Sequence, residues 1–129
     1  MKKVTLDTNI IISAILSPNG KAAQIMQQFF DGKIQLYYCE EILSEYENVL
    51  LRPKFDFEVE KREAFLTGIK RLGILIHPEK SDICFIDESD RIFYDTAKAC
   101  NAILITGNIK HYPVEPFVMT PTDFLIYCI

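Results

Sequence analysis

Residues 3–16 read KVTLDTNIIISAIL, and this stretch decides the fold. Residues 3–6 predict a short β-strand, and the apolar run 10–16 predicts a helix that follows it almost at once. Asp7, Thr8 and Asn9 lie between the two. The turn-forming residues 17–20, SPNG, then end the helix. A strand that passes through a short polar segment into a helix is the first unit of an alternating β/α fold.

The same alternation continues along the rest of the chain. Further helices are predicted over residues 21–31, 40–51, 58–72, 90–100 and 122–129, and further strands over residues 34–39, 74–76, 102–105 and 116–119. The helix over residues 40–51 is the clearest, because its apolar positions form one stripe. Strands that alternate with helices favour an α/β fold with a parallel sheet of about five strands, covered by helices on both faces.

The composition is that of an ordinary globular protein. The chain has 129 residues, 49% of them hydrophobic, so we expect one domain over residues 1–129. No apolar run reaches the roughly 18 residues that a membrane helix needs, and no secretory signal is evident, which favours a cytoplasmic protein without membrane contact. The four cysteines are far apart and lie in apolar stretches, so we expect buried free thiols.

The net charge of −4 argues against a protein that holds nucleic acid by bulk attraction. It leaves room for an enzyme that clusters acids around a cation. In parallel sheets, ligands bind beyond the carboxyl ends of the strands. The polar residues just past two predicted strands are therefore candidates, and they are Asp7, Asn9, Thr106 and Asn108.

Two further acidic candidates lie on helices. On the helix over residues 40–51, Glu45 and Glu47 flank the two edges of the apolar stripe and could reach a cleft beside the sheet. Asp90 opens another helix, just after Asp87. Asp95 lies about 140° around that helix and is expected to pair with Arg91 across one turn.

Each candidate also has a plain structural interpretation. Asp7 could simply cap a helix, and Asp90 could stabilise the positive end of a helix dipole. Glu45 could belong to a solvated face, and Asn108 to a turn. Taken together, however, clustered carboxylates repel one another, and a divalent cation relieves that repulsion. Mg²⁺ or Mn²⁺ prefers oxygen ligands and can activate water for attack on a phosphodiester.

Three segments resemble the PIN-domain family. They are VTLDTNIIISAI (residues 4–15), ILSEYENVLLRPKF (residues 42–55) and DESDRIFYDTAKACNAILITGN (residues 87–108). In this resemblance the second acid is Glu45, and the third, Asp90, opens a helix seven residues before Ala97. The resemblance implies a three-layer α/β/α sandwich and metal-dependent cleavage of RNA. It also implies that the protein is the toxin of a toxin–antitoxin pair, with an antitoxin partner, and forms a homodimer.

The same resemblance assigns roles to the candidate residues. Asp7 and Asp90 would be ligands of Mg²⁺ or Mn²⁺, and Glu45 a ligand or the group that positions the water. Many members carry a fourth acid where this chain has Asn108, so one metal ion is expected rather than two. Asn108, Thr106 and Asn9 would support the site. The candidate RNA contacts are Arg52, Lys54, Lys110 and His111.

Three other functions remain as alternatives. A haloacid-dehalogenase-type phosphatase would need a second Asp where this chain has Asn9. A dinucleotide-binding protein would need a Gly-rich loop after the first strand. A PIN-like protein that binds RNA or an antitoxin without cutting is compatible with Asn108 and with the acidic composition.

Overall fold

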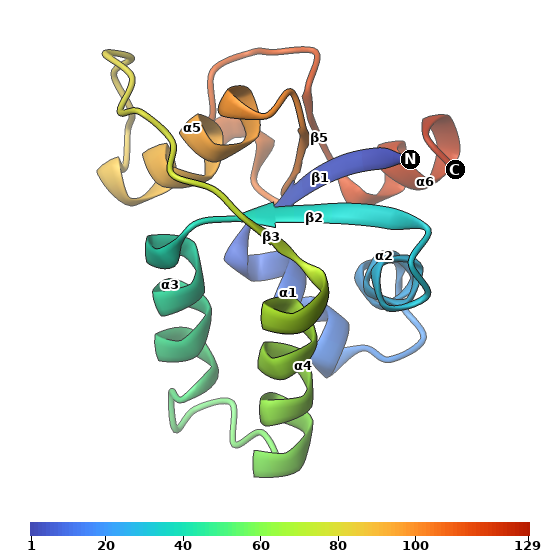
Figure 1. The fold of residues 1–129 in the computed structure, drawn as a ribbon. Coiled ribbons are helices and arrows are strands. Elements are labelled where there is room, and N and C mark those ends of the chain that lie inside the picture. Colours follow the sequence, from blue (N-terminus) through green and yellow to red (C-terminus); the bar gives the residue numbers. More distant parts are fainter.

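A parallel sheet runs through the middle of the computed structural model, which describes all 129 residues (Figure 1). The sheet has five strands in the order β3-β2-β1-β4-β5. Every neighbouring pair is parallel. The strands are β1 (Lys2–Leu6), β2 (Ile34–Tyr38), β3 (Ile74–Leu75), β4 (Ile103–Ile105) and β5 (Val118–Met119).

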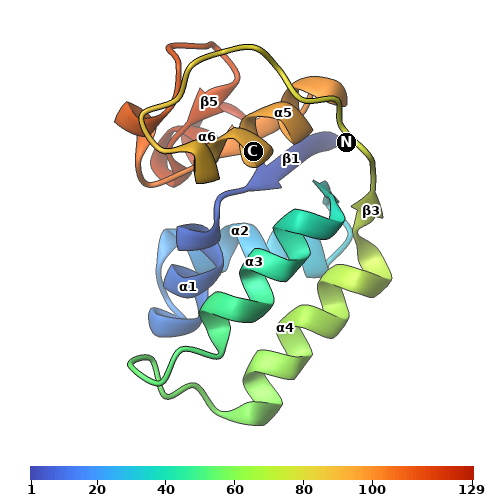
Figure 2. The same cartoon turned by 90° about the vertical axis from the view of Figure 1, so that its left-hand side faces the viewer.

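Helices cover both faces of this sheet, as the three-layer prediction requires. The helices α1 to α4 lie on one side and α5 lies on the other (Figures 1 and 2). Their bounds are α1 (Thr8–Leu16), α2 (Lys21–Phe30), α3 (Glu40–Leu50), α4 (Val59–Leu72), α5 (Arg91–Ala99) and α6 (Pro121–Tyr127), with short 3-10 turns η1 (Glu88–Asp90) and η2 (Ile109–His111). No helix is long and apolar enough to cross a membrane.

The core forms where the central strand meets both helical layers. Val4 of β1 is aligned with Leu36 of β2 on one side and with Ile103 of β4 on the other. Val4 and Leu36 have no exposed surface, and neither has Ile42 of α3. Burying an aliphatic side chain of this size stabilises the fold by about 1.5–3 kcal/mol. The strand that precedes Asp7 is therefore paired on both sides and packed against the core.

Several predicted boundaries were wrong by a few residues. The first helix begins at Thr8, not at residue 10, because the Asp7 carboxylate caps it by accepting a bond from the Thr8 N–H at 2.7 Å. The last helix begins at Pro121, where the Thr120 hydroxyl accepts a bond from the Asp123 N–H at 3.1 Å. The last strand covers two of the four residues predicted for it.

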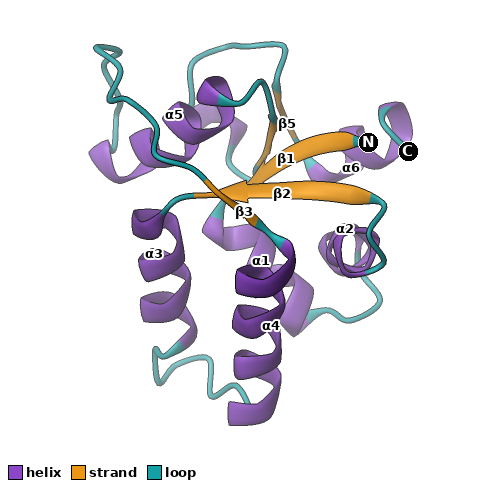
Figure 3. Cartoon of the chain, viewed as in Figure 1, coloured by secondary structure: helices purple, strands orange, loops and turns teal.

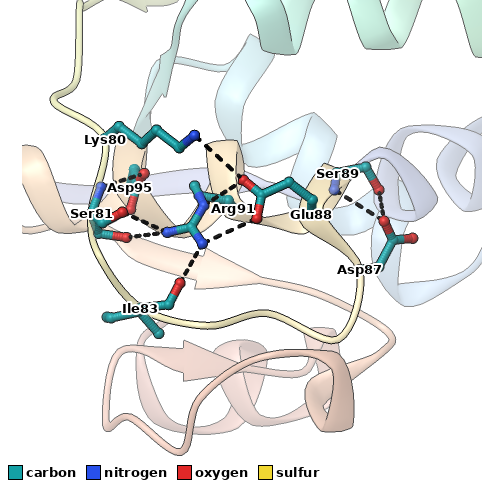
Figure 4. Close-up of polar contacts among 8 residues, drawn as sticks. All are labelled: Lys80, Ser81, Ile83, Asp87, Glu88, Ser89, Arg91 and Asp95. Atoms are coloured by element: carbon teal, nitrogen blue, oxygen red, sulfur yellow. Dashed lines mark hydrogen bonds and ion pairs between the residues drawn. The ribbon is translucent and has the colours of Figure 1, made fainter.

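The connection between β3 and α5, residues 76–87, has no helix or strand (Figure 3). Arg91 holds it against α5, because its guanidinium donates to the backbone carbonyls of Ser81, at 2.7 Å, and Ile83 (Figure 4). The ion-pair partner of Arg91 is Glu88, at 2.6 Å, and not Asp95 as predicted. Asp95 instead accepts a hydrogen bond from the Ser81 N–H at 3.0 Å.

All four cysteines are free, as predicted, but they are not all buried. Cys39 is buried in the core, whereas Cys84 is exposed. The expectation of burial failed at Cys84 because an apolar sequence context does not distinguish a core strand from an irregular loop. The remaining two thiols, Cys100 and Cys128, are partly exposed.

Candidate active site

The candidate site lies where the order of strands reverses direction. From β1 the chain builds the sheet outward through β2 and β3, and then returns to the other side of β1 with β4 and β5. A ligand crevice is expected at the carboxyl ends of the two strands that flank such a switch point. Here these are β1 and β4, whose last residues Leu6 and Ile105 are aligned with each other. Asp7 and Thr106 follow them directly, and the Asp7 N–H donates to the Ile105 carbonyl at 3.0 Å.

The Asp7 carboxylate is held by three donors. Its Oδ1 atom accepts a bond from the Thr8 N–H at 2.7 Å. Its Oδ2 atom accepts bonds from the Thr106 hydroxyl at 2.7 Å and from the Tyr112 hydroxyl at 2.9 Å. The residue is only 7% exposed. Three donors on one buried carboxylate fix its orientation.

The loop after β4 is joined to the loop after β1 by polar contacts. The Gly107 N–H donates to Asn9 Oδ1 at 3.1 Å, and the Asn108 N–H donates to the Thr106 hydroxyl at 2.9 Å. Asn9 and Thr106 were both predicted as supporting residues. Asn9 binds the backbone of the loop after β4, and Thr106 binds Asp7. Asn108 is exposed, and its side chain makes no hydrogen bond. Its amide remains free to bind another group.

Asp90 is the second acid that the fold brings to this edge. Its side chain is 13% exposed, and its Oδ2 atom is buried without a hydrogen-bond partner. Burial, and then the negative charges of Asp7 and Asp87, together raise the pKa of Asp90 to about 6, while His111 lowers it. His111, 3.6 Å from Asp90 Oδ2, is followed directly by Tyr112, whose hydroxyl donates to Asp7, so both acids lie at the same edge of the sheet. A buried carboxylate oxygen without a donor is costly, so this site favours a cation.

The predicted third acid, Glu45, lies on α3 next to a residue that anchors this helix. The neighbouring Tyr46 is fully buried, and its hydroxyl donates to the backbone carbonyl of Leu6, just before Asp7. Burial, and then the charge of Asp7, raise the pKa of Tyr46 well above its usual value. Glu45 itself is partly exposed and makes no hydrogen bond or ion pair.

The two other acids considered from the sequence have different partners. Glu47 lies 3.5 Å from Lys70 of α4 and so faces that helix. Asp87 is exposed and accepts bonds from the Ser89 N–H at 3.0 Å and the Ser89 hydroxyl at 2.8 Å. These hydrogen bonds lower the pKa of Asp87. Both acids therefore make local contacts of their own.

The side chains fit a divalent cation in part. No group of three His, Cys, Asp or Glu side chains lies close enough together to hold a metal ion. The Asp7 and Asp90 pair, with its unpartnered Asp90 Oδ2 atom, nevertheless offers the oxygen donors that Mg²⁺ and Mn²⁺ prefer. An ion that keeps several of its waters needs only one or two carboxylates from the protein. Asp7 and Asp90 would therefore hold it, and Glu45 remains a predicted third member.

The predicted RNA contacts fall in two places. Lys110 belongs to η2, next to His111, whose Nδ1 atom lies 3.6 Å from Asp90 Oδ2. Both line a cleft of about 320 Å³ together with Asn108. Arg52 and Lys54 lie in the connection between α3 and α4, which is at the far end of these helices from the sheet (Figure 1). Lys110 is therefore beside the acid pair, whereas Arg52 and Lys54 are not.

Sequence reasoning missed the contribution of the two tyrosines. Tyr46 was predicted only as part of an apolar stripe, and Tyr112 was not predicted at all. Both tyrosines are buried, and each hydroxyl has an acceptor. A buried tyrosine normally needs a hydrogen-bond partner, which is the one signal that would have drawn attention to them.

The fold and the site define an α/β sandwich with a buried acid, Asp7, and a half-buried one, Asp90, at the switch point of its parallel sheet. The family profile of the PIN domain matches residues 3–110, and the chain belongs to that family. This confirms the resemblance described from the sequence.

Known relatives agree with this assignment. An uncharacterized protein of Methanocaldococcus jannaschii, MJ1680, is 33% identical over 109 residues, which are 82% of this chain and 70% of that protein. The crystal structure of VapBC2 from Rickettsia felis, bound to a DNA fragment from their promoter, has a chain of similar fold, with a TM-score of 0.60 and 18% identity, covering 92% of this chain and 96% of that one. VapBC-1 from nontypeable Haemophilus influenzae has a TM-score of 0.58 and 19% identity, covering 84% and 89%.

Proposed function

We propose that this protein is an endoribonuclease that depends on Mg²⁺ or Mn²⁺ and acts as the toxin of a toxin–antitoxin pair in the cytoplasm. One observation carries the enzymatic part. Asp7 is fixed by three donors at the same edge as Asp90, and the buried Asp90 Oδ2 atom has no hydrogen-bond partner. Such a pair is arranged to receive a hard cation. PIN domains are generally nucleases that use divalent metals, and the match to that family supports this function.

The residues around the pair suggest how RNA would be cut. A bound divalent cation would stabilise the negative charge that develops on the scissile phosphate and make water more acidic. Asp7 and Asp90 would hold that cation, and Glu45 would accept a proton from the attacking water. Lys110 and His111, beside the cleft, would bind the phosphates that flank the cut. Asp90 would hold the cation in its ionised form, which the charge of the cation would itself favour.

The toxin role and its partners rest on similarity in fold. Two solved relatives are VapBC assemblies. By analogy, this protein would form a homodimer and bind an antitoxin protein encoded beside it. Co-expression with the adjacent open reading frame, followed by co-purification and measurement of mass in solution, tests both statements. A monomer that does not retain the neighbouring gene product would contradict them.

A direct test is incubation with a mixed RNA pool in Mg²⁺ or in Mn²⁺, with and without a chelator. Wild-type protein is expected to cut only when metal is present, and Asp7→Asn is expected not to cut. The matched control is Asp82→Asn, which alters an exposed acid outside the site and should cut like wild type. Cleavage that survives Asp7→Asn or chelation would reject the proposal.

The second candidate function is binding of RNA or of an antitoxin without cleavage. Two observations favour it: no three-residue metal group is formed, and Asn108 stands at an exposed position where many family members have an acid. The same incubation distinguishes the two functions. RNA binding with intact RNA in every metal would support the second candidate.

A further inference from the structure

Tyr112 is a buried side chain that bonds directly to Asp7 and has no role in the function proposed above. It follows η2 and is only 6% exposed. Its ring packs edge-on against Phe85, with the ring centroids 6.3 Å apart and the planes at 84°. Its hydroxyl donates to Asp7 Oδ2 at 2.9 Å. Burial keeps this phenol protonated by raising its pKa, so it acts only as a donor toward the carboxylate.

The donors are divided unequally between the two oxygens of Asp7. A carboxylate oxygen accepts about two hydrogen bonds. The Oδ2 atom receives two hydroxyl donors, from Thr106 and Tyr112, so its capacity is used. The Oδ1 atom accepts only the Thr8 N–H. Oδ1 is therefore the Asp7 oxygen that can accept a further bond.

We propose that Tyr112 is a positioning residue of the metal site: by holding Asp7 Oδ2, it leaves Oδ1 to bind a divalent cation shared with Asp90. This inference rests on the proposed function, because it requires the Asp7 and Asp90 pair to bind a cation. Tyr112 itself would touch neither the cation nor the RNA. Its effect would reach the cation through the Asp7 carboxylate.

Two effects of the hydroxyl oppose each other. A donor withdraws negative charge from Asp7, which weakens its attraction for a cation. The same donor fixes the carboxylate before the cation arrives, so less conformational entropy is lost on binding. Hydrogen-bond partners of metal ligands are usually worth about 10- to 100-fold in metal affinity, so the positioning effect is expected to dominate.

A Tyr112 hydroxyl that competes with the cation would have the opposite effect on metal affinity. If the Tyr112 hydroxyl occupied the place of the cation, it would compete with the metal, and its removal would tighten binding. The change Tyr112→Phe removes only the hydroxyl and keeps the ring against Phe85. Tyr94→Phe is a matched control, because Tyr94 is 1% exposed and its hydroxyl also donates to a carboxylate, that of Glu115.

The experiment is a titration of the full chain with Mn²⁺, in which free Mn²⁺ is measured by electron paramagnetic resonance. Wild type and Tyr94→Phe are expected to bind with equal affinity, and Tyr112→Phe about tenfold more weakly or worse. Asp7→Asn should not bind. RNA cleavage by Tyr112→Phe should recover toward the wild-type rate as Mn²⁺ is raised, which a merely structural role would not produce.

The outcomes separate this inference from the proposed function. Equal or tighter Mn²⁺ binding by Tyr112→Phe, with normal binding by wild type, would overturn the role of Tyr112 and leave the nuclease proposal standing. Absence of Mn²⁺ binding by wild type would overturn the proposed function itself and, with it, this inference. Melting curves of the metal-free proteins are measured in parallel. A Tyr112→Phe protein that fails to fold would also overturn the inference, because the hydroxyl would then serve the fold.

Discussion

His111 Nδ1 lies 3.6 Å from Asp90 Oδ2, yet no hydrogen bond joins the two side chains. The imidazole is half exposed, whereas the carboxylate is mostly buried. His111 lowers the pKa of Asp90, but burial and the charges of Asp7 and Asp87 outweigh it. The net result is a carboxyl group with a pKa of about 6, which titrates close to neutral pH.

The first prediction concerns the pH dependence of stability without metal. The folded-state pKa of Asp90, about 6, lies above its usual value of 3.8, so the folded protein keeps a proton that the unfolded chain has released between these values. Stability is therefore expected to fall as pH rises through this window. The shift corresponds to at most about 3 kcal/mol, and solvent screening reduces it to about 1 kcal/mol.

Asp90→Asn removes the carboxyl group whose ionisation destabilises the fold. The variant should therefore have a higher urea midpoint than wild type at pH 7 and nearly the same midpoint at pH 4. The measurement is urea unfolding with a chelator present. Asp82→Asn, at an exposed position, serves as the control and should follow wild type at both pH values. A destabilised Asp90→Asn at pH 7 would contradict the assignment of Asp90 as an unpartnered buried acid.

The second prediction distinguishes two acids on α3. Glu45→Gln is expected to lower the rate of RNA cleavage about 100-fold or more, as the loss of a general base does. Glu47→Gln is the matched control, because Glu47 pairs with Lys70 on the surface at 3.5 Å, and such pairs contribute about 0–1 kcal/mol. Single-turnover cleavage at saturating Mn²⁺ is the assay. Equal rates for the two variants would remove Glu45 from the site.

The third prediction concerns the anchor of α3. Tyr46→Phe leaves the Leu6 carbonyl without its buried donor, which should destabilise the fold by about 1–3 kcal/mol. Tyr38→Phe is the control, since Tyr38 is 6% exposed and its hydroxyl makes no hydrogen bond within the protein. The free energy of unfolding in urea measures both. If the two variants lost the same stability, the Tyr46 hydroxyl would not be the anchor.

The fourth prediction concerns the connection over residues 76–87. Lysine cannot reproduce the fork by which Arg91 binds Glu88 together with the Ser81 and Ile83 carbonyls. Arg91→Lys should therefore speed amide hydrogen exchange in this segment while the strands keep their protection. Arg71→Lys, at an exposed position of α4, is the comparison. Unchanged exchange in residues 76–87 would show that another contact holds the segment.

The carboxyl-end residues of the site were accessible to prediction from sequence. Asp7 and Thr106 each follow a short apolar run, and parallel strands end at the same edge of a sheet. The aligned pair Leu6 and Ile105 confirms that these two positions are neighbours. The apolar pattern was sufficient to predict these two positions, because it shows where each strand ends and parallel strands run in the same direction.

The other contacts of the site depend on distances between side chains, which the spacing of residues in the sequence does not give. The spacing on α3 gives the angle of Glu45 around the helix but not how far its carboxylate lies from Asp7. Arg91 and Asp95 have the spacing of an ion pair, yet Asp95 bonds to Ser81 from an irregular segment. The Tyr112 hydroxyl bonds to an acid 105 positions earlier, and no pattern in the sequence assigned that tyrosine a role.

The placement of β1 between β2 and β4 has a consequence during synthesis of the chain. Asp7 leaves the ribosome before the two residues whose hydroxyls hold it, Thr106 and Tyr112, which lie 99 and 105 positions later. At typical elongation rates, that interval is roughly 5–20 s. A nascent chain therefore carries Asp7 for several seconds before the hydroxyls that orient its carboxylate have been synthesised. A nuclease assembled in this order would stay inactive until Thr106 and Tyr112 had been synthesised.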